Sequence, residues 1–182
     1  RQPIFDVSKQ VVGYELLFRD GIQNCFPAEQ QGDNATCGII ASGLSIGFEA
    51  LTGGKRAFIN FTESNIQTGL AKLVPEQLLA VEILETVEPS GQIVAACREL
   101  KKAGYQIVLD DFVFQAKYQP FIELADIIKI DFLACVPQKR AFLRKIIPSS
   151  VQLLAEKVES EEDFRSGVEM GYSLFQGYFF SR

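Results

Sequence analysis

The chain contains no histidine among its 182 residues. This absence excludes a Ser-His or Cys-His catalytic pair, and it removes the ligand that catalytic zinc usually uses. Any catalysis must therefore depend on carboxylates, amides, lysine and arginine. That set of groups suits a hard cation such as Mg²⁺ or Mn²⁺.

Cysteine pairs spaced for metal binding are also missing. The four cysteines, Cys25, Cys37, Cys97 and Cys135, lie far apart, and none forms a Cys-x-x-Cys pair. That spacing argues against zinc and indicates free thiols in a reducing compartment. We therefore expect a cytoplasmic protein.

The chain has no run rich in lysine and arginine, and no apolar run of about 18 residues that would span a bilayer. Its formal net charge is −5 and its sequence pI is near 4.9. A nucleic-acid polymer or an anionic membrane surface is a poor partner for such a chain, because both need a basic face. No signal peptide is recognisable, and the start at Arg1 rather than methionine leaves room for an upstream segment.

The order of hydrophobic runs predicts the fold. With 47% hydrophobic residues, the chain can bury one core and is expected to form a single domain. The predicted strands are 2–6, 11–18, 56–61, 77–84, 106–112, 127–131, 151–158 and 174–179, and the main predicted helices are 35–51, 89–103, 137–148 and 160–171. The first two strands are joined by too few residues for a helix, so they should form an antiparallel hairpin. From the third strand onward helices alternate with strands, which predicts an α/β fold: a compact TIM-type (β/α)8 barrel with its first strand antiparallel.

Several predicted strands contain or end in a residue of metal-ligand type. The run QIVLDDF ends in Asp110 and Asp111, which repel each other unless a cation lies between them or one stays protonated. Glu82 lies inside an apolar run and needs a partner if it is buried. Lys129, between isoleucines, points either into a polar barrel centre or out to water. Glu15 is either on the solvated face of an edge strand or a ligand.

In a barrel of this kind, the carboxyl ends of the strands meet at one rim. The side chains expected at this rim are Glu15, Asn60, Glu82, Asp110, Asp111, Lys129, Glu156 and Gln176. Core packing does not explain such a set. It fits a pair of divalent cations bridged by the aspartates, which activate water against a phosphodiester.

Eight ordered segments resemble those of the EAL domain, the cyclic di-GMP phosphodiesterase family, from one end of the chain to the other. They are QPI (2–4), GYELLFR (13–19), FIN (58–60), VEILE (81–85), LDDF (109–112), IKID (128–131), LAEKVE (154–159) and QGYFFSR (176–182). The segment GGKRAFINFT also resembles the subgroup in which an EAL domain precedes an HDOD domain. The resemblance therefore implies that residues 1–182 form an EAL-like barrel domain of a longer chain, with a further domain C-terminal to it.

The resemblance also implies an activity, its cofactors and its site. The activity is hydrolysis of cyclic di-GMP to linear pGpG in bacterial signalling, by a cytoplasmic homodimer that uses two Mg²⁺ or Mn²⁺ ions and is inhibited by Ca²⁺. The implied metal ligands are Glu15, Asn60, Glu82, Asp110 and Asp111. The residues implied to position and deprotonate water are Lys129 and Glu156, and those implied to contact the substrate are Gln2, Arg19 and Gln176. Two further residues, Glu85 and Glu159, match positions that support the ligands.

Three features depart from the family's pattern. Leu16 replaces an alanine in the signature triplet, which leaves the carboxylate of Glu15 intact. Val113–Lys117 replaces Gly-Thr-Gly-Tyr-Ser, and Lys157 replaces a glycine. The lost glycines remove backbone freedom from a loop that, in the family, couples metal binding to dimer contacts. Two alternatives to this enzyme stay open: a non-enzymatic module that binds cyclic di-GMP or a protein through the rim, and hydrolysis of another cyclic nucleotide or phosphodiester.

Overall fold

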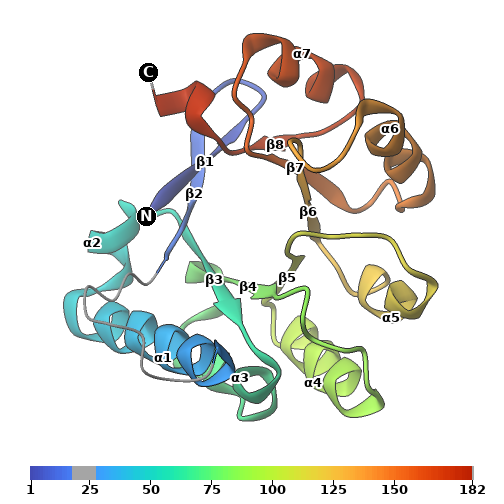
Figure 1. Ribbon diagram of the computed structural model, residues 1–182. Helices are drawn as coiled ribbons and strands as arrows, with labels where there is room; N and C mark the ends of the chain where they lie inside the picture. Colours follow the sequence, from blue (N-terminus) through green and yellow to red (C-terminus); the bar gives the residue numbers. More distant parts are fainter. Residues whose placement is uncertain (18–27, 182) are drawn as a thin grey trace.

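The computed structural model describes residues 1–17 and 28–181, in which eight strands form a closed barrel (Figure 1). In order around the barrel the strands are β1 (Gln2–Asp6), β2 (Val11–Glu15), β3 (Arg56–Phe61), β4 (Leu79–Ile83), β5 (Gln106–Leu109), β6 (Ile127–Asp131), β7 (Gln152–Glu156) and β8 (Leu174–Phe175). Strands β2 to β8 are parallel, and β1 is antiparallel to both of its neighbours, β2 and β8. The predicted α/β barrel with an antiparallel first strand is confirmed.

Helices cover the outside of the barrel (Figure 1). They are α1 (Ala28–Ile46), α2 (Phe48–Thr52), α3 (Glu63–Gln67), α4 (Gly91–Lys102), α5 (Gln119–Ile122), α6 (Pro137–Ile146) and α7 (Glu161–Glu169), with short 3₁₀ turns at η1 (Leu70–Leu73), η2 (Glu76–Leu78), η3 (Ala116–Tyr118) and η4 (Tyr178–Ser181). Within the described ranges, no helix has the length and apolarity needed to cross a membrane.

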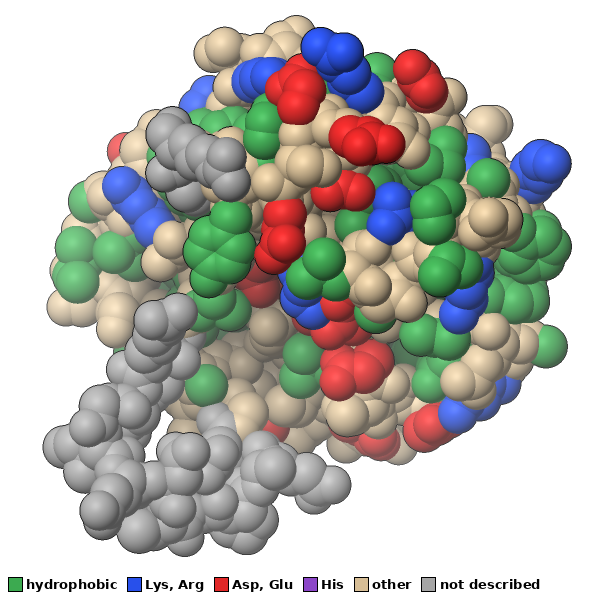
Figure 2. All heavy atoms as spheres, turned by 45° about the horizontal axis from the view of Figure 1, so that its top comes forward, with side chains coloured by type: hydrophobic (Ala, Val, Ile, Leu, Met, Phe, Trp, Pro, Cys, Tyr) green, Lys and Arg blue, Asp and Glu red, His purple; other side chains and the backbone are tan. Residues whose placement is uncertain are grey.

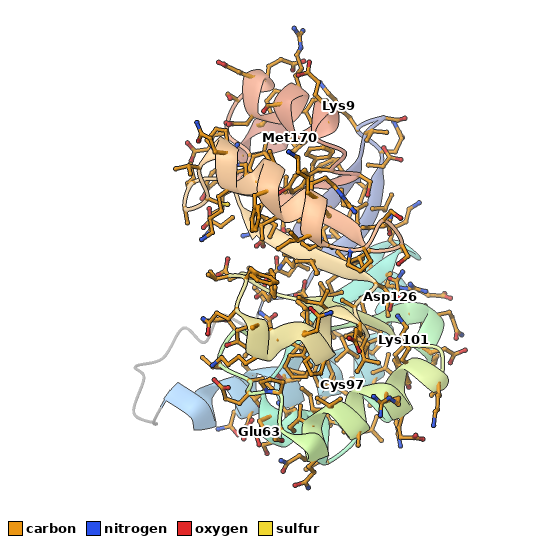
Figure 3. The ribbon with its side chains drawn as sticks, turned by 90° about the vertical axis from the view of Figure 1, so that its right-hand side faces the viewer. Lys9, Glu63, Cys97, Lys101, Asp126 and Met170 are labelled. Atoms are coloured by element: carbon orange, nitrogen blue, oxygen red, sulfur yellow. The ribbon has the colours of Figure 1, made fainter. Side chains whose placement is uncertain are left out.

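Hydrogen bonds and an ion pair hold the helices in place. Ser160 Oγ accepts from the backbone N–H of Asp163 at 3.0 Å, which caps α7. On α4, Lys101 Nζ lies 2.8 Å from Asp126 Oδ1, just before β6 (Figure 3). The other oxygen of Asp126 accepts from the N–H of Ile107 at 2.9 Å. One carboxylate therefore joins α4 to β5.

The first helical region differs from the prediction. The sequence predicts one helix over 35–51, and Asp33 or Asn34 has the chemistry to cap it, whereas the structure has α1 and α2, separated at Gly47. The φ of Gly47 is 95°, in the left-handed region that interrupts a helix. Asp33 lies inside α1, where its carboxylate accepts a hydrogen bond from Thr62 Oγ1. That side chain serves a tertiary contact in place of a cap.

Five strands, β2, β4, β5, β7 and β8, end earlier than predicted, and after three of them a residue with positive φ follows within two positions. These residues are Asp111 after β5 (φ 41°), Lys157 after β7 (φ 55°) and Gly177 after β8 (φ 152°). A Cβ added at Gly177 would lie 2.2 Å from the carbonyl oxygen of Val158, so only glycine fits there. Each of these turns bends the chain away from the ladder at the carboxyl end of its strand.

The barrel interior is filled by a single apolar layer. It consists of Ile4, Phe58, Ala80, Val108, Ile127, Leu154 and Leu174, one from each strand except β2. On β2 the matching position is Gly13, where an added Cβ would lie 2.5 Å from a ring carbon of Phe58. The ring of Phe58 therefore fills the space beside β2. A larger core lies between strands and helices, and the interior layer forms a dry floor beneath the strand ends.

Candidate active site

Each of the eight strands places one polar side chain directly above the apolar floor. Side chains alternate between the two faces of a strand, so a residue two positions beyond an interior residue also points inward. We call this set the polar ring: Gln2, Glu15, Asn60, Glu82, Asp110, Lys129, Glu156 and Gln176. Gln2 precedes its interior residue Ile4 instead of following it, because β1 runs in the opposite direction.

Lys129 lies at the centre of the polar ring, and only 1% of it is exposed. Its Nζ lies 2.7 Å from Asp110 Oδ1, 3.0 Å from Glu156 Oε1, 3.1 Å from Glu82 Oε1 and 3.7 Å from Glu15 Oε1. Of the two orientations that the sequence allows for Lys129 and for Glu15, the structure shows the inward one. Glu82 also has the partner that its burial requires. A single ammonium faces four carboxyl groups.

Burial and charge shift the pKa values of this cluster. Burial raises the pKa of Glu82 well above its usual range, although Lys129 opposes the shift. Burial likewise raises the pKa of Glu156 to about 7. Burial acts to lower the pKa of Lys129, but the carboxylates around it, Glu82 first, outweigh that effect and raise the pKa well above its usual value. Burial therefore favours the neutral form of Glu82 and Glu156, while the carboxylates favour the charged form of Lys129.

Several buried oxygens of the polar ring have no hydrogen-bond donor among the described residues. They are Asn60 Oδ1, Glu82 Oε2, Glu156 Oε2 and Gln176 Oε1. Buried acceptors are normally paired, so unpaired ones indicate that a partner is missing. Carboxylate and amide oxygens are the donors that Mg²⁺, Mn²⁺ and Ca²⁺ prefer. The ring therefore fits a divalent cation.

The arrangement of the carboxylates is nevertheless set by the lysine. Across residues 1–17 and 28–181, no group of three or more Asp, Glu, Cys or His side chains is gathered closely enough to hold a metal ion by itself. The ammonium of Lys129 takes the central position, and Glu15, Glu82, Asp110 and Glu156 are spaced around it. The metal-ligand roles of the ring residues remain predictions.

A cavity of about 480 Å³ opens above the ring. Its lining includes the ring residues Gln2, Glu15, Asp110, Glu156 and Gln176, together with the predicted site residues Asp111 and Glu159. Acidic side chains gather around a hollow in the middle of the face shown in Figure 2. Acidic side chains therefore outnumber basic ones among the residues that line the cavity.

The remaining predicted site residues lie outside the ring. Asp111, Glu85 and Glu159 are exposed, so they are available to a ligand at the mouth rather than buried behind the ring. Glu85 lines a second cavity of about 190 Å³, which it shares with Asp110 and Asp111. Arg19, predicted to contact a phosphate, lies outside the described residues.

The segment that departs from the family's loop, Val113–Lys117, is attached to the β4–α4 connection. Lys117 Nζ lies 2.7 Å from Glu88 Oε1. Just beyond the segment, Tyr118 Oη donates to the carbonyl oxygen of Glu85 at 3.5 Å. These contacts lie on the rim side of the smaller cavity and fasten the segment to a neighbouring loop.

Asp131, at the end of β6, has no predicted role, yet it contacts Lys157 of the cavity lining. Its carboxylate pairs with Lys157, and its Oδ1 accepts from the backbone N–H groups of Leu133 and Ala134 at 2.7 Å and 2.9 Å. The alternation along β6 is a signal that could have found it. Asp131 follows Lys129 by two positions, so it occupies the next step toward the mouth.

The fold and the ring together define a class of protein: an α/β barrel with an acidic, lysine-centred site at the carboxyl ends of its strands. The family model described as "EAL domain" matches residues 41–182, well over half of the chain. The chain belongs to the EAL domain family.

Two curated relatives match the whole chain. The "Uncharacterized protein YuxH" of Bacillus subtilis is 42% identical over all of this chain and 46% of its own length. The "Cyclic di-GMP phosphodiesterase CdgJ" of Vibrio cholerae is 39% identical over all of this chain and 43% of its own length. The chain therefore spans less than half the length of these relatives.

A solved structure shares the fold. The Bacillus subtilis YkuI protein, with an EAL domain, in complex with substrate c-di-GMP and calcium, superposes with a TM-score of 0.77. The match covers all of this chain and 54% of that chain, at 21% sequence identity. At that identity, the likeness establishes the fold alone.

Proposed function

We propose that this chain binds cyclic di-GMP in the cavity above the polar ring and hydrolyses one of its phosphodiester bonds, with linear pGpG as product. The observation that carries the proposal is a ring of buried, unpaired hard oxygen donors beside Lys129 and Glu156. The 39% identity to a protein named as a cyclic di-GMP phosphodiesterase supports the choice of substrate.

The implied cofactors are two Mg²⁺ or Mn²⁺ ions. Their ligands would be Glu15, Asn60, Glu82, Asp110 and Asp111. Bound cations would supply an activated water at neutral pH and stabilise the oxygens of the phosphodiester. The surplus of buried acceptors supports this assignment. Ca²⁺ is expected to permit binding of the substrate and to suppress its turnover.

The chain's own groups would handle the proton of the attacking water. The carboxylate of Glu156 lines the cavity, where it can accept that proton as a general base. Lys129 Nζ, 3.0 Å from Glu156 Oε1, orients that carboxylate. Gln2, Gln176 and, in the segment that the structure does not describe, Arg19 would contact the substrate. Glu85 and Glu159 would support the ligands from the mouth.

A second candidate is a receptor that binds cyclic di-GMP without hydrolysing it. The observation that favours it is the altered segment Val113–Lys117, which carries no glycine and is fastened to Glu88 by an ion pair. A segment held in this way has less freedom to adjust the aspartates that precede it.

The test measures both binding and turnover. The purified chain is incubated with cyclic di-GMP and Mn²⁺ or Mg²⁺, pGpG is followed by chromatography, and binding is titrated in Ca²⁺. The enzyme predicts pGpG that disappears in Glu15→Gln and persists in Glu99→Gln, which alters an exposed carboxylate on α4. Binding without product establishes the receptor instead. If the chain shows no binding and forms no product, both candidates are contradicted.

The resemblance to EAL domains supports three proposals about the protein's assembly, domain organisation and location. They are a homodimer, a C-terminal HDOD domain in a longer chain, and a place in the bacterial cytoplasm. Light scattering on the purified protein tests the first, since a monomer at micromolar concentration would contradict it.

A further inference from the structure

The cavity above the polar ring poses an electrostatic problem for the substrate proposed above. Cyclic di-GMP carries two phosphate charges, whereas the carboxylates of Glu15, Asp110, Asp111, Glu156 and Glu159 line the cavity. A dianion entering such a cavity needs positive charge within reach of its phosphates. The divalent cations and Arg19 proposed above would supply part of that charge, and Lys129 lies beneath, enclosed by carboxylates, so a further cation at the mouth would strengthen binding.

Two basic side chains stand among the described residues that line the cavity, Arg1 and Lys157. The guanidinium of Arg1 is already engaged: it lies 4.6 Å above the ring centre of Tyr14 and donates to the carbonyl oxygen of Leu51. Lys157 differs, because 51% of its side chain is exposed and a single carboxylate, that of Asp131, pairs with it. The lysine end of this pair is exposed to solvent, and Asp131 also accepts from two backbone N–H groups, so its carboxylate keeps hydrogen-bond donors when the ammonium leaves.

The backbone at Lys157 is fixed in an uncommon conformation. Its φ of 55° lies in the left-handed region, which costs a side-chain-bearing residue free energy that glycine avoids. The adjoining residue holds it there, because Val158 N–H donates to Gln176 O at 3.0 Å and Val158 O accepts from Phe179 N–H at 3.0 Å. Strain of this kind persists where neighbours determine the backbone, and it gathers at functional sites.

The charge of Lys157 is secure at neutral pH. The hydrogen bond to Asp131, more than any other contact, raises the pKa of Lys157 above its usual value. A lysine stem is also long and flexible, so the ammonium can turn from Asp131 at the wall toward the centre of the cavity without a change in the backbone.

We propose that Lys157 is a substrate-contacting residue: its ammonium leaves Asp131 and contacts a phosphate of the cyclic dinucleotide bound in the cavity. This inference rests on the proposed function. It explains why this chain has lysine at position 157, where the family's pattern has glycine. That lysine supplies positive charge at the mouth of the cavity.

Lys9 offers a matched control for the experiment. It too has a positive φ, 59°, and pairs with one carboxylate, Glu161, at 3.4 Å; unlike Lys157, it also lies 4.9 Å and 4.8 Å from the ring centres of Phe164 and Phe179. It lies in the turn between β1 and β2, whereas Gln2 and Glu15 occupy the opposite ends of those strands, and it does not line the cavity. Figure 3 labels it beside α7.

Affinity for cyclic di-GMP is titrated in Ca²⁺ for the wild type, Lys157→Met, Lys157→Gly, Lys157→Arg and Asp131→Asn, and for Lys9→Met and Lys9→Gly. We expect Lys157→Met and Lys157→Gly to weaken binding about tenfold, as for a lost charge-assisted hydrogen bond, and to reduce its salt dependence. Lys157→Arg and the Lys9 variants should bind like the wild type. Asp131→Asn should bind at least as tightly, because it frees the ammonium.

Thermal melting separates the ligand contact from a structural role. Glycine relieves the left-handed backbone, so Lys157→Gly should melt about 2–4 °C higher and yet bind poorly. Lys9→Gly gains the same relief but loses the contacts of its ammonium with the rings of Phe164 and Phe179, so its melting temperature should rise less while its binding stays unchanged. Three results would overturn the inference while the proposed function stands: unchanged affinity in Lys157→Met, equal weakening in Lys9→Met, or equal weakening in Asp131→Asn. A wild type that does not bind cyclic di-GMP overturns both.

Discussion

Gln176 Nε2 donates to Glu15 Oε2 at 2.7 Å, across a separation of 161 positions in the chain. The same nitrogen donates to Gln2 Oε1 at 3.0 Å. The amide of Gln176, directly after β8, is therefore hydrogen-bonded to one polar-ring residue of β1 and one of β2. The orientation of the Glu15 carboxylate is set by a side chain from the last strand of the barrel.

Removal of this amide should weaken the binding of divalent cations. Gln176→Ala leaves Glu15 without its donor, and loss of a group that orients a metal ligand costs about 10–100-fold in affinity. We expect a loss of that order for Mn²⁺ by titration calorimetry, with a parallel loss in kcat/KM. Gln152→Ala is the control, because this exposed glutamine lies at the opposite end of β7. Equal Mn²⁺ affinity in the wild type and Gln176→Ala would contradict the role.

Lys129→Met should destabilise the metal-free protein severely. Removal of the ammonium leaves buried carboxylates without their cation, which costs about 3–5 kcal/mol when one partner of a buried pair is lost. Urea unfolding at pH 7 measures the loss. Addition of Mn²⁺ should restore part of it, because the cation replaces the missing charge. Lys117→Met, which breaks the exposed pair with Glu88, should leave the unfolding free energy nearly unchanged. A Lys129→Met protein as stable as the wild type would refute the ammonium's central role.

Replacement of Val113–Lys117 by Gly-Thr-Gly-Tyr-Ser tests whether this segment limits turnover. The change breaks the ion pair to Glu88 and returns backbone freedom next to Asp111. We expect higher turnover of cyclic di-GMP with little change in its affinity, both measured as above. Lys117→Met alone breaks the ion pair without introducing glycine, so it distinguishes the effect of the ion pair from that of backbone freedom. If the wild type binds cyclic di-GMP tightly without hydrolysing it, and the exchanged variant does the same, the segment is not the cause of the inactivity.

The thiol of Cys97 should make stability depend on alkaline pH. Cys97 faces the core from α4 (Figure 3), and burial raises its pKa from 9.0 to about 11. Above pH 9 the unfolded chain loses this proton while the folded chain keeps it. Stability should therefore fall as pH rises from 9 to 11, by up to about 2–3 kcal/mol from this group. Urea midpoints across that range should fall less steeply in Cys97→Ala than in the wild type. Cys37→Ser, at an exposed thiol, should keep the wild-type slope.

The part of the site that could be predicted follows from strand periodicity. Asn60, Glu82 and Lys129 lie inside apolar runs, where alternation leaves them the inner face, and the closed barrel brings all such positions to one rim. Periodicity does not determine which ion-pair or hydrogen-bond partner each of these side chains contacts. The pairing of Lys129 with four carboxyl groups depends on the lengths of side chains from five strands, which a linear pattern does not encode.

The strand ends and the first helix were predicted less well, for local reasons. Asp111 and Lys157 adopt positive φ although neither is glycine, so residue type gave no sign that β5 and β7 stop there. Asp33 has the chemistry of a helix cap, but Thr62, distant in sequence, claims its carboxylate. In each case a tertiary contact or a rim turn overrides a local preference.

The antiparallel first strand has a kinetic consequence. β1 pairs with β2 within a short hairpin, but its pairs Phe5 with Phe175 and Asp6 with Leu174 close the barrel between the two ends of the described chain. Contacts of such high sequence separation form late, because the intervening chain must be ordered first. Until β8 is in place the nascent sheet keeps two open edges, and Glu15 has no amide to orient it. We therefore expect the site to assemble last, so the appearance of ligand binding during refolding would time the closure of the barrel.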